Sequence, residues 1–187
     1  MGPNERRSFM KSAAAGALAF TVGGVDVLLT PREARAQNVP FRLLKSGEAD
    51  TLEAIGETMV PGARAGGIAH FLDQQFSVPA EEALLQARIL NVRPPYVNFY
   101  RAVVAGIDKA SRAGYDQRRF AELTSGEQRE LINALRQNKL AGWEGPPPPF
   151  VYLLLRSDAV DVVYGTMEGY ESLGVPYQAH IAPERRW

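Results

Sequence analysis

Two histidines, His70 and His180, are the side chains in this sequence best suited to binding a metal or transferring a proton. Asp73 and Gln74 follow His70 on one face of a predicted helix, and this spacing would offer two metal ligands. No third ligand is indicated by spacing, so we favour a structural histidine that hydrogen-bonds locally. His180 lies beside Ile181 near the C-terminus, where it either packs on protein or binds a metal or haem of a partner.

Carboxylate pairs also occur at helical spacing, Glu53 with Glu57 and Asp158 with Asp161, and such pairs can perform acid–base chemistry. The same spacing is typical of solvated helix faces, which is the interpretation we favour. The absence of cysteine excludes Fe–S clusters, thiolate nucleophiles and covalent c-type haem. No G-x-G-x-x-G fingerprint and no G-x-S-x-G nucleophile elbow occurs. We therefore expect no catalytic, cofactor-binding or metal-binding residue on this chain.

The elements that would position these residues are helices. Apolar residues recur at i, i+3, i+4 and i+7, most clearly in 94–114, which we expect to be the central core helix. Thr124 and Glu127 have the spacing of a capping box at the start of the following helix. Because no segment shows a strand period, we predict a single all-α domain over 37–164. Its six or so helices are expected at 46–60, 68–76, 79–90, 94–114, 124–135 and 150–164.

Two further segments have the composition of interfaces. The stretch 142–149 combines a tryptophan with four prolines and reads as a stiff, polyproline-like insert. The tail 165–187 has no helical period but keeps many aromatic residues, so we predict an irregular, extended segment that either docks on a partner or folds back on its own domain. The predicted partner-interface residues are Trp143, Pro147, Tyr164, Tyr170, Tyr177, His180 and Trp187.

The N-terminus has the three parts of an export signal. A basic start precedes an apolar run from Ser12 to Leu29, and Ala34-Arg35-Ala36 before Gln37 fits a peptidase that accepts small residues. The paired arginines resemble the twin-arginine translocation signal, whose pathway carries folded proteins. We therefore expect a signal peptide over 1–36, which is either cleaved, with Ala34, Ala36 and Gln37 at the cleavage site, or kept as an uncleaved membrane anchor. The protein is expected in the periplasm, free or at the inner membrane's periplasmic face. The residues expected to contact the twin-arginine translocase are Arg6, Arg7, Phe9 and Lys11.

The charge balance argues against nucleic acid as a partner. The chain has 21 basic and 21 acidic residues, so its net charge is near zero. Nucleic-acid binding depends on neutralising phosphates with clustered basic side chains, and no such cluster is present in the sequence. We expect the partners to be proteins.

Several short motifs resemble the small subunit, subunit 3 or gamma, of gluconate 2-dehydrogenase and related flavoprotein dehydrogenases. The resemblance covers most of the chain after the signal. It rests on Phe41, Leu52-Glu53-Ala54-Ile55, Met59-Val60-Pro61, Gly66-Gly67-Ile68, Phe71-Leu72-Asp73, Phe120-Ala121-Glu122-Leu123 and the aromatic, Gly-rich tail that ends in Trp187.

This resemblance implies a function through partners. Members of the family are typically complexed with a large FAD-containing dehydrogenase subunit of the glucose-methanol-choline type, and with a multihaem cytochrome c. It implies a non-catalytic subunit that clamps the flavoprotein and escorts it through twin-arginine export, with FAD on the partner and haem c on a possible third subunit. The alternative is a free-standing exported metal-binding domain or enzyme that uses His70 and His180.

Overall fold

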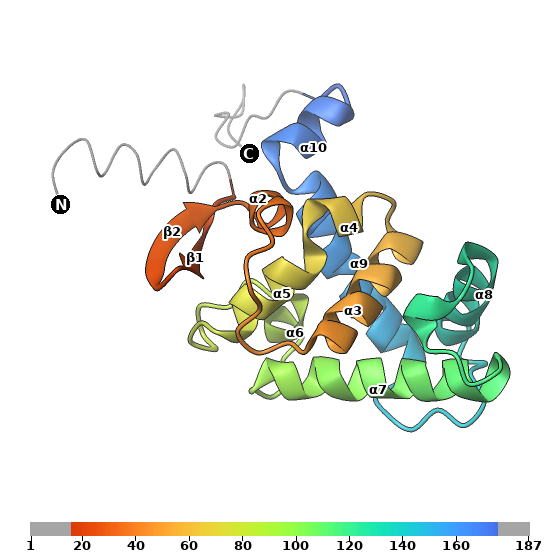
Figure 1. The fold of residues 1–187 in the computed structure, drawn as a ribbon. Helices are drawn as coiled ribbons and strands as arrows, with labels where there is room; N and C mark the ends of the chain where they lie inside the picture. The colour runs from red at the N-terminus through yellow and green to blue at the C-terminus, as the bar shows by residue number, and fades with distance from the viewer. Residues whose placement is uncertain (1–15, 176–187) are drawn as a thin grey trace, which may run out of the picture.

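The computed structural model describes residues 16–175 of the chain, and this part is mostly helical (Figure 1). A two-stranded hairpin comes first and helices follow to the end. The strands are β1 (Leu18–Val22) and β2 (Val25–Leu29). The helices are α2 (Pro31–Ala36), α3 (Ser46–Met59), α4 (Ala63–Gly66), α5 (Ile68–Phe76), α6 (Gln86–Ile89), α7 (Tyr96–Gly114), the 3-10 turn η1 (Phe120–Glu122), α8 (Ser125–Arg136), α9 (Pro148–Tyr164) and α10 (Met167–Ser172). The prediction of a small helical domain is confirmed.

Helix α3 is the centre of the domain. It contacts α4, α5, α7, α8, α9 and η1, and Figure 1 shows it between α9 and the long α7. Small residues allow this close packing: a Cβ on Gly56 would lie 3.1 Å from Ile68. Leu52 and Ile55 are 2% and 1% exposed, and burying such a side chain stabilises the fold by about 1.5–3 kcal/mol. The prediction that 94–114 is the central helix is therefore wrong, because α7 covers one side of the core.

Several predicted helix boundaries agree with the structure. Thr124 and Glu127 form the capping box at the start of α8, with the Thr124 amide donating to Glu127 Oε2 at 2.7 Å. The helix predicted over 68–76 is α5. Helix α9 begins two residues before the predicted 150, because Pro148 has no amide hydrogen to lose in the first turn. The stiff insert therefore ends at Pro147.

Two other segments differ from the prediction. The helix expected over 79–90 is reduced to α6, because the amide of Leu84 donates to Gln75 Oε1 at 2.5 Å instead of to a helical carbonyl. The tail expected to be irregular contains α10, which Thr166 caps by accepting from the Gly169 amide at 3.0 Å. Within the described part of the tail, residues 167–172 are therefore helical.

The largest difference lies in the apolar run assigned to the export signal, whose second half forms the hairpin. Phe20 pairs with Val27, and Gly23 and Gly24 make the two-residue turn with φ of 59° and 83°. Positive φ at both turn positions suits the right-handed twist of paired strands, and glycine adopts it without strain. The expectation of no strands is wrong here, because each strand has only five residues, too few to show a strand period within the apolar run.

None of the helices between residues 16 and 175 combines the length and the apolar character needed to cross a bilayer.

Candidate functional site

His70 lies in the first turn of α5 and is 6% exposed. Its Nε2 is 3.1 Å from the carbonyl oxygen of Val39, and its ring centroid is 4.6 Å from that of Phe41. Burial lowers the pKa of His70, so the imidazole is neutral at pH 7 and its Nε2–H donates to Val39. Within the described residues its Nδ1 has no hydrogen-bond partner. His70 thus binds the segment that precedes α3.

Asp73 binds the same segment one helical turn further on. Its Oδ2 accepts from the amide of Arg42 at 2.7 Å, and its Oδ1 accepts from the amides of Leu43 and Leu44, both at 2.8 Å. Three backbone donors on one carboxylate use its acceptor positions and fix the path of the chain. Asp73 is therefore an anchor for residues 42–44.

The predicted metal ligands His70, Asp73 and Gln74 lie on α5 as expected, but their side chains form hydrogen bonds to other protein groups. Gln74 Oε1 accepts from Gln75 Nε2 at 2.6 Å, while His70 and Asp73 bind backbone groups. Between residues 16 and 175, no group of three or more His, Asp or Glu side chains is placed to share a metal ion. His180, the other candidate ligand, lies outside the described residues.

Glu53 and Glu57 are both engaged with neighbouring elements. Glu53 forms ion pairs with Arg35 at 3.1 Å and with Arg64 at 3.7 Å. Glu57 accepts from the amides of Gly62 at 3.0 Å and Arg64 at 2.9 Å, which caps the start of α4. The two carboxylates hold α2 and α4 against α3.

Asp158 and Asp161 have different environments despite their spacing. Asp158 is 1% exposed; its Oδ1 accepts from the Gln86 amide at 2.9 Å and its Oδ2 accepts the Tyr100 hydroxyl. Burial raises the pKa of Asp158 to about 7, although both hydrogen bonds act to lower it. Asp161 is exposed, and partial burial raises the pKa of its carboxyl. Because only one of the two reaches solvent freely, they do not form a facing acid–base pair.

Asp161 lies at a pocket of about 430 Å³. Leu18, Phe71, Leu84 and Val162 supply its apolar lining, so the pocket lies where the hairpin meets α5 and α9. An apolar pocket with few polar groups resembles a ligand site in shape. Among the residues that line it, Asp161 is the one whose pKa is shifted.

Asp108 is a buried carboxylate that the sequence reasoning did not single out. It accepts from the Phe120 amide at 3.0 Å and lies 3.4 Å from the Thr51 hydroxyl, so it connects α7 to η1 and α3. The sequence signal that could have identified Asp108 is its position next to Ile107, which lies on the apolar face of α7.

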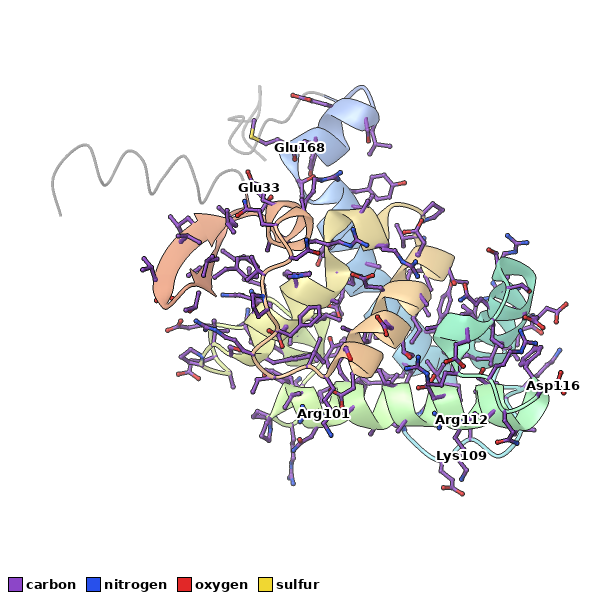
Figure 2. All side chains as sticks on the ribbon, in the orientation of Figure 1. Glu33, Arg101, Lys109, Arg112, Asp116 and Glu168 are labelled. Atoms are coloured by element: carbon purple, nitrogen blue, oxygen red, sulfur yellow. The ribbon has the colours of Figure 1, made fainter. Side chains whose placement is uncertain are left out.

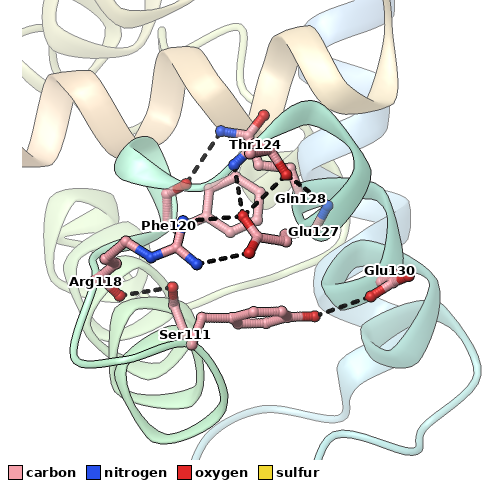
Figure 3. Close-up of polar contacts among 8 residues, drawn as sticks. Ser111, Arg118, Phe120, Thr124, Glu127, Gln128 and Glu130 are labelled. Atoms are coloured by element: carbon pink, nitrogen blue, oxygen red, sulfur yellow. Dashed lines mark hydrogen bonds and ion pairs between the residues drawn. The ribbon is translucent and has the colours of Figure 1, made fainter.

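A second polar cluster fixes the loop between α7 and α8 (Figure 3). Ser111 donates to the carbonyl of Arg118 at 2.8 Å, and both terminal nitrogens of Arg118 donate to Glu127, at 3.0 and 2.6 Å. The hydrogen bonds from Arg118 and Thr124 lower the pKa of Glu127 to about 2. The cluster positions η1, whose Phe120 is fully buried.

The exposed charges along α7 are also used structurally (Figure 2). Arg101 pairs with Glu48 at 3.0 Å, and Lys109 pairs with Glu144 at 2.9 Å. The Lys109–Glu144 pair is exposed and contributes at most about 1 kcal/mol, while the Arg101–Glu48 pair is partly buried. They join the first turn of α3 and the insert 142–147 to α7.

The predicted interface residues fall into three groups. Trp143 is half-buried: its Nε1 donates to the Pro146 carbonyl at 2.8 Å, and its ring lies so close to α7 that a Cβ on Gly106 would be 2.9 Å away. Pro147 is exposed and precedes α9, and Tyr164 and Tyr170 are half-buried near α10. Tyr177, His180 and Trp187 lie outside the described residues.

The predicted signal residues are divided in the same way. Arg6, Arg7, Phe9 and Lys11 lie outside the described residues. The expected cleavage site lies in α2, where Ala34 is fully buried while Ala36 and the following Gln37 are exposed.

One comparison with known proteins identifies a family. The family model described as gluconate 2-dehydrogenase subunit 3 matches residues 46–180, which is most of the chain. No curated protein and no solved structure matches this chain significantly.

Proposed function

Because the chain belongs to the gluconate 2-dehydrogenase subunit 3 family, whose name describes an accessory subunit of a dehydrogenase complex, we propose that it is the non-catalytic small subunit of a FAD-dependent complex. In this proposal it binds a large FAD-containing flavoprotein of the glucose-methanol-choline type and escorts it through twin-arginine export. FAD is bound by that partner, and a multihaem cytochrome c is a possible third subunit.

The observation that carries the proposal is that, between residues 16 and 175, the candidate catalytic side chains other than Asp161 are bound within the fold. His70 and Asp73 bind backbone groups of residues 39–44, and Asp158 is sealed between α6 and α7. Groups held in this way cannot reach a substrate without unfolding their surroundings. Activity is therefore expected on a partner chain.

The end of the described chain offers apolar surface for such a partner. Met167, Leu173 and Val175 are 41%, 57% and 47% exposed, and α10 packs mainly on α9. Met167 lies in α10, and Leu173 and Val175 follow its last residue. Exposed apolar side chains close together in the chain are common in the buried centres of protein interfaces. We expect the flavoprotein to cover α10, with Tyr164 and Tyr170 at the same surface.

The first test is isolation of the complex. The chain, tagged at its C-terminus in its native host, is recovered from periplasmic and membrane fractions, and the absorption spectrum and masses of its companions are recorded. A large chain with a flavin spectrum, lost from the periplasm when Arg6 and Arg7 are both changed to lysine, is the expected result. Arg32→Lys, an exposed change in α2, is the matched control. A colourless lone polypeptide would contradict the proposal and favour the metal-binding alternative.

A second test locates the interface. Leu173→Asp should reduce the amount of co-purified flavoprotein at least tenfold, because it places a charge in the proposed apolar contact. Leu153→Asp is the matched control, since Leu153 is 51% exposed but lies in the first half of α9. Equal recovery from both variants would show that α10 is not the contact.

A further inference from the structure

The residues immediately before the family match are built into the fold. The match begins at residue 46, yet α2 lies against α4 and α5 and the hairpin contacts α5 and α2 (Figure 1). Residues 39–44 are bonded to α5. We call residues 18–45 the N-terminal clasp. Their place in the domain conflicts with removal of residues 1–36, which the sequence motif predicts.

Helix α2 makes the closest of these contacts. Ala34 is fully buried, and the carbonyl oxygen of Pro31 would lie 2.1 Å from a Cβ at Gly67, so only glycine allows the approach. Arg35 adds the ion pair with Glu53 at 3.1 Å. The start of α2 is fixed by a complete capping box of Thr30 and Glu33.

The two ends of the clasp are attached as well. Phe20 of β1 is 6% exposed and forms a small apolar cluster with Ala34 and Val39. Residues 39–44 are held by the bonds to His70 and Asp73 described above. Cutting after Ala36 would remove Phe20 and Ala34 together and leave Val39 without its packing partners.

From these contacts we infer that residues 18–45 remain in the mature subunit, and that the chain is not cut after Ala36. A processing peptidase needs a short extended stretch of backbone, and the Ala34-Arg35-Ala36 motif is instead helical with its first alanine facing the core. A pathway that carries folded proteins would present the motif in this protected form. This inference concerns the fold of the chain and does not require the flavoprotein partner.

The direct test is the intact mass of the protein. C-terminally tagged chain is purified from the periplasmic fraction of its native host, and its mass and N-terminal residue are determined. The expected N-terminus lies before Leu18. An N-terminus at Gln37 would overturn the inference.

A pair of variants tests the clasp independently of export. Ala34→Asp buries a carboxylate against α4 and α5 and should lower Tm by roughly 5 °C or more, while Ala36→Asp on the exposed side of the same helix should change it little. Equal melting temperatures for the two purified proteins would mean that α2 is absent or detached. If the chain is found only in the cytoplasm, both the export proposal and the inference of an uncut mature subunit fail, while the Ala34 and Ala36 comparison still tests the packing of α2 on α4 and α5.

Discussion

The buried carboxylate of Asp158 leads to a prediction about pH. It lies between the Gln86 amide and the Tyr100 hydroxyl with 1% exposure. Asp158→Asn keeps the shape and the hydrogen bonds, because an amide oxygen can accept from Gln86 and an amide nitrogen can donate to the Tyr100 oxygen. The substitution replaces the carboxyl group, which ionises, with an amide, which does not.

The sign and size of the pH effect on stability follow from the pKa of Asp158, which rises from 3.8 to about 7 on folding. Between these values the folded chain keeps a proton that the unfolded chain has lost, so the free energy of unfolding falls as pH rises. Each pKa unit corresponds to about 1.4 kcal/mol, which gives a loss of up to about 4 kcal/mol from pH 4 to pH 8. The lowered pKa of His70 acts oppositely, since its stabilising effect increases as pH rises toward 6.5.

The assay is urea unfolding of wild type and Asp158→Asn at several pH values from 4.5 to 8. Comparing the two proteins at each pH cancels the contribution of His70. We expect the variant's advantage to grow from near zero at pH 4.5 to at least about 2 kcal/mol at pH 8. Asp50→Asn, an exposed change on α3, is the control and should show no such trend. A difference that stays constant or shrinks with rising pH would refute the reasoning.

Further predictions concern the contacts of α5 and the helix caps. Gly67→Ala should destabilise by at least about 2 kcal/mol, because φ is +83° and the new Cβ would meet Pro31; Gly126→Ala, with only Thr124 Oγ1 nearby at 3.9 Å, should instead stabilise by about 0.5 kcal/mol in the same urea experiment. Asp73→Ala should cost about 3 kcal/mol by calorimetry, since three amides lose their acceptor, and a loss below 1 kcal/mol would mean that water replaces it. His70→Ala should cost about 2 kcal/mol through the lost bond to Val39, and a neutral result would contradict the role assigned to it.

Local signals predicted those parts of the fold that depend on neighbouring residues. The capping box at Thr124 and the apolar stripe of α7 each depend on residues only a few positions apart in the chain. Both can therefore be recognised from the sequence alone. The hairpin was missed although Gly23-Gly24 between Val22 and Val25 is a known turn signal, because the basic start and the A-x-A motif favoured an export signal for the whole stretch.

The candidate site depended on contacts that the sequence does not show. Asp158 and Asp161 lie one helical turn apart on α9. Asp158 is buried against Gln86, which is 72 residues away in the chain, and against Tyr100, which is 58 residues away. His70 and Asp73 were grouped correctly on one helix face, but their partners are backbone groups of residues 39–44, about 30 residues earlier in the chain. Whether His70 and Asp73 bind a metal or anchor the preceding backbone could therefore be decided only from the tertiary structure.

The way α5 holds the preceding chain has a consequence for how sequences in this family can diverge. His70 and Asp73 bind a carbonyl and three amides of residues 39–44, and every amino acid except proline supplies the same amide. Substitutions at Arg42 or Leu43 leave these bonds intact, whereas one change at Asp73 removes three of them. These bonds therefore depend on the side chains of α5, and they place no requirement on the side chains at positions 42 and 43.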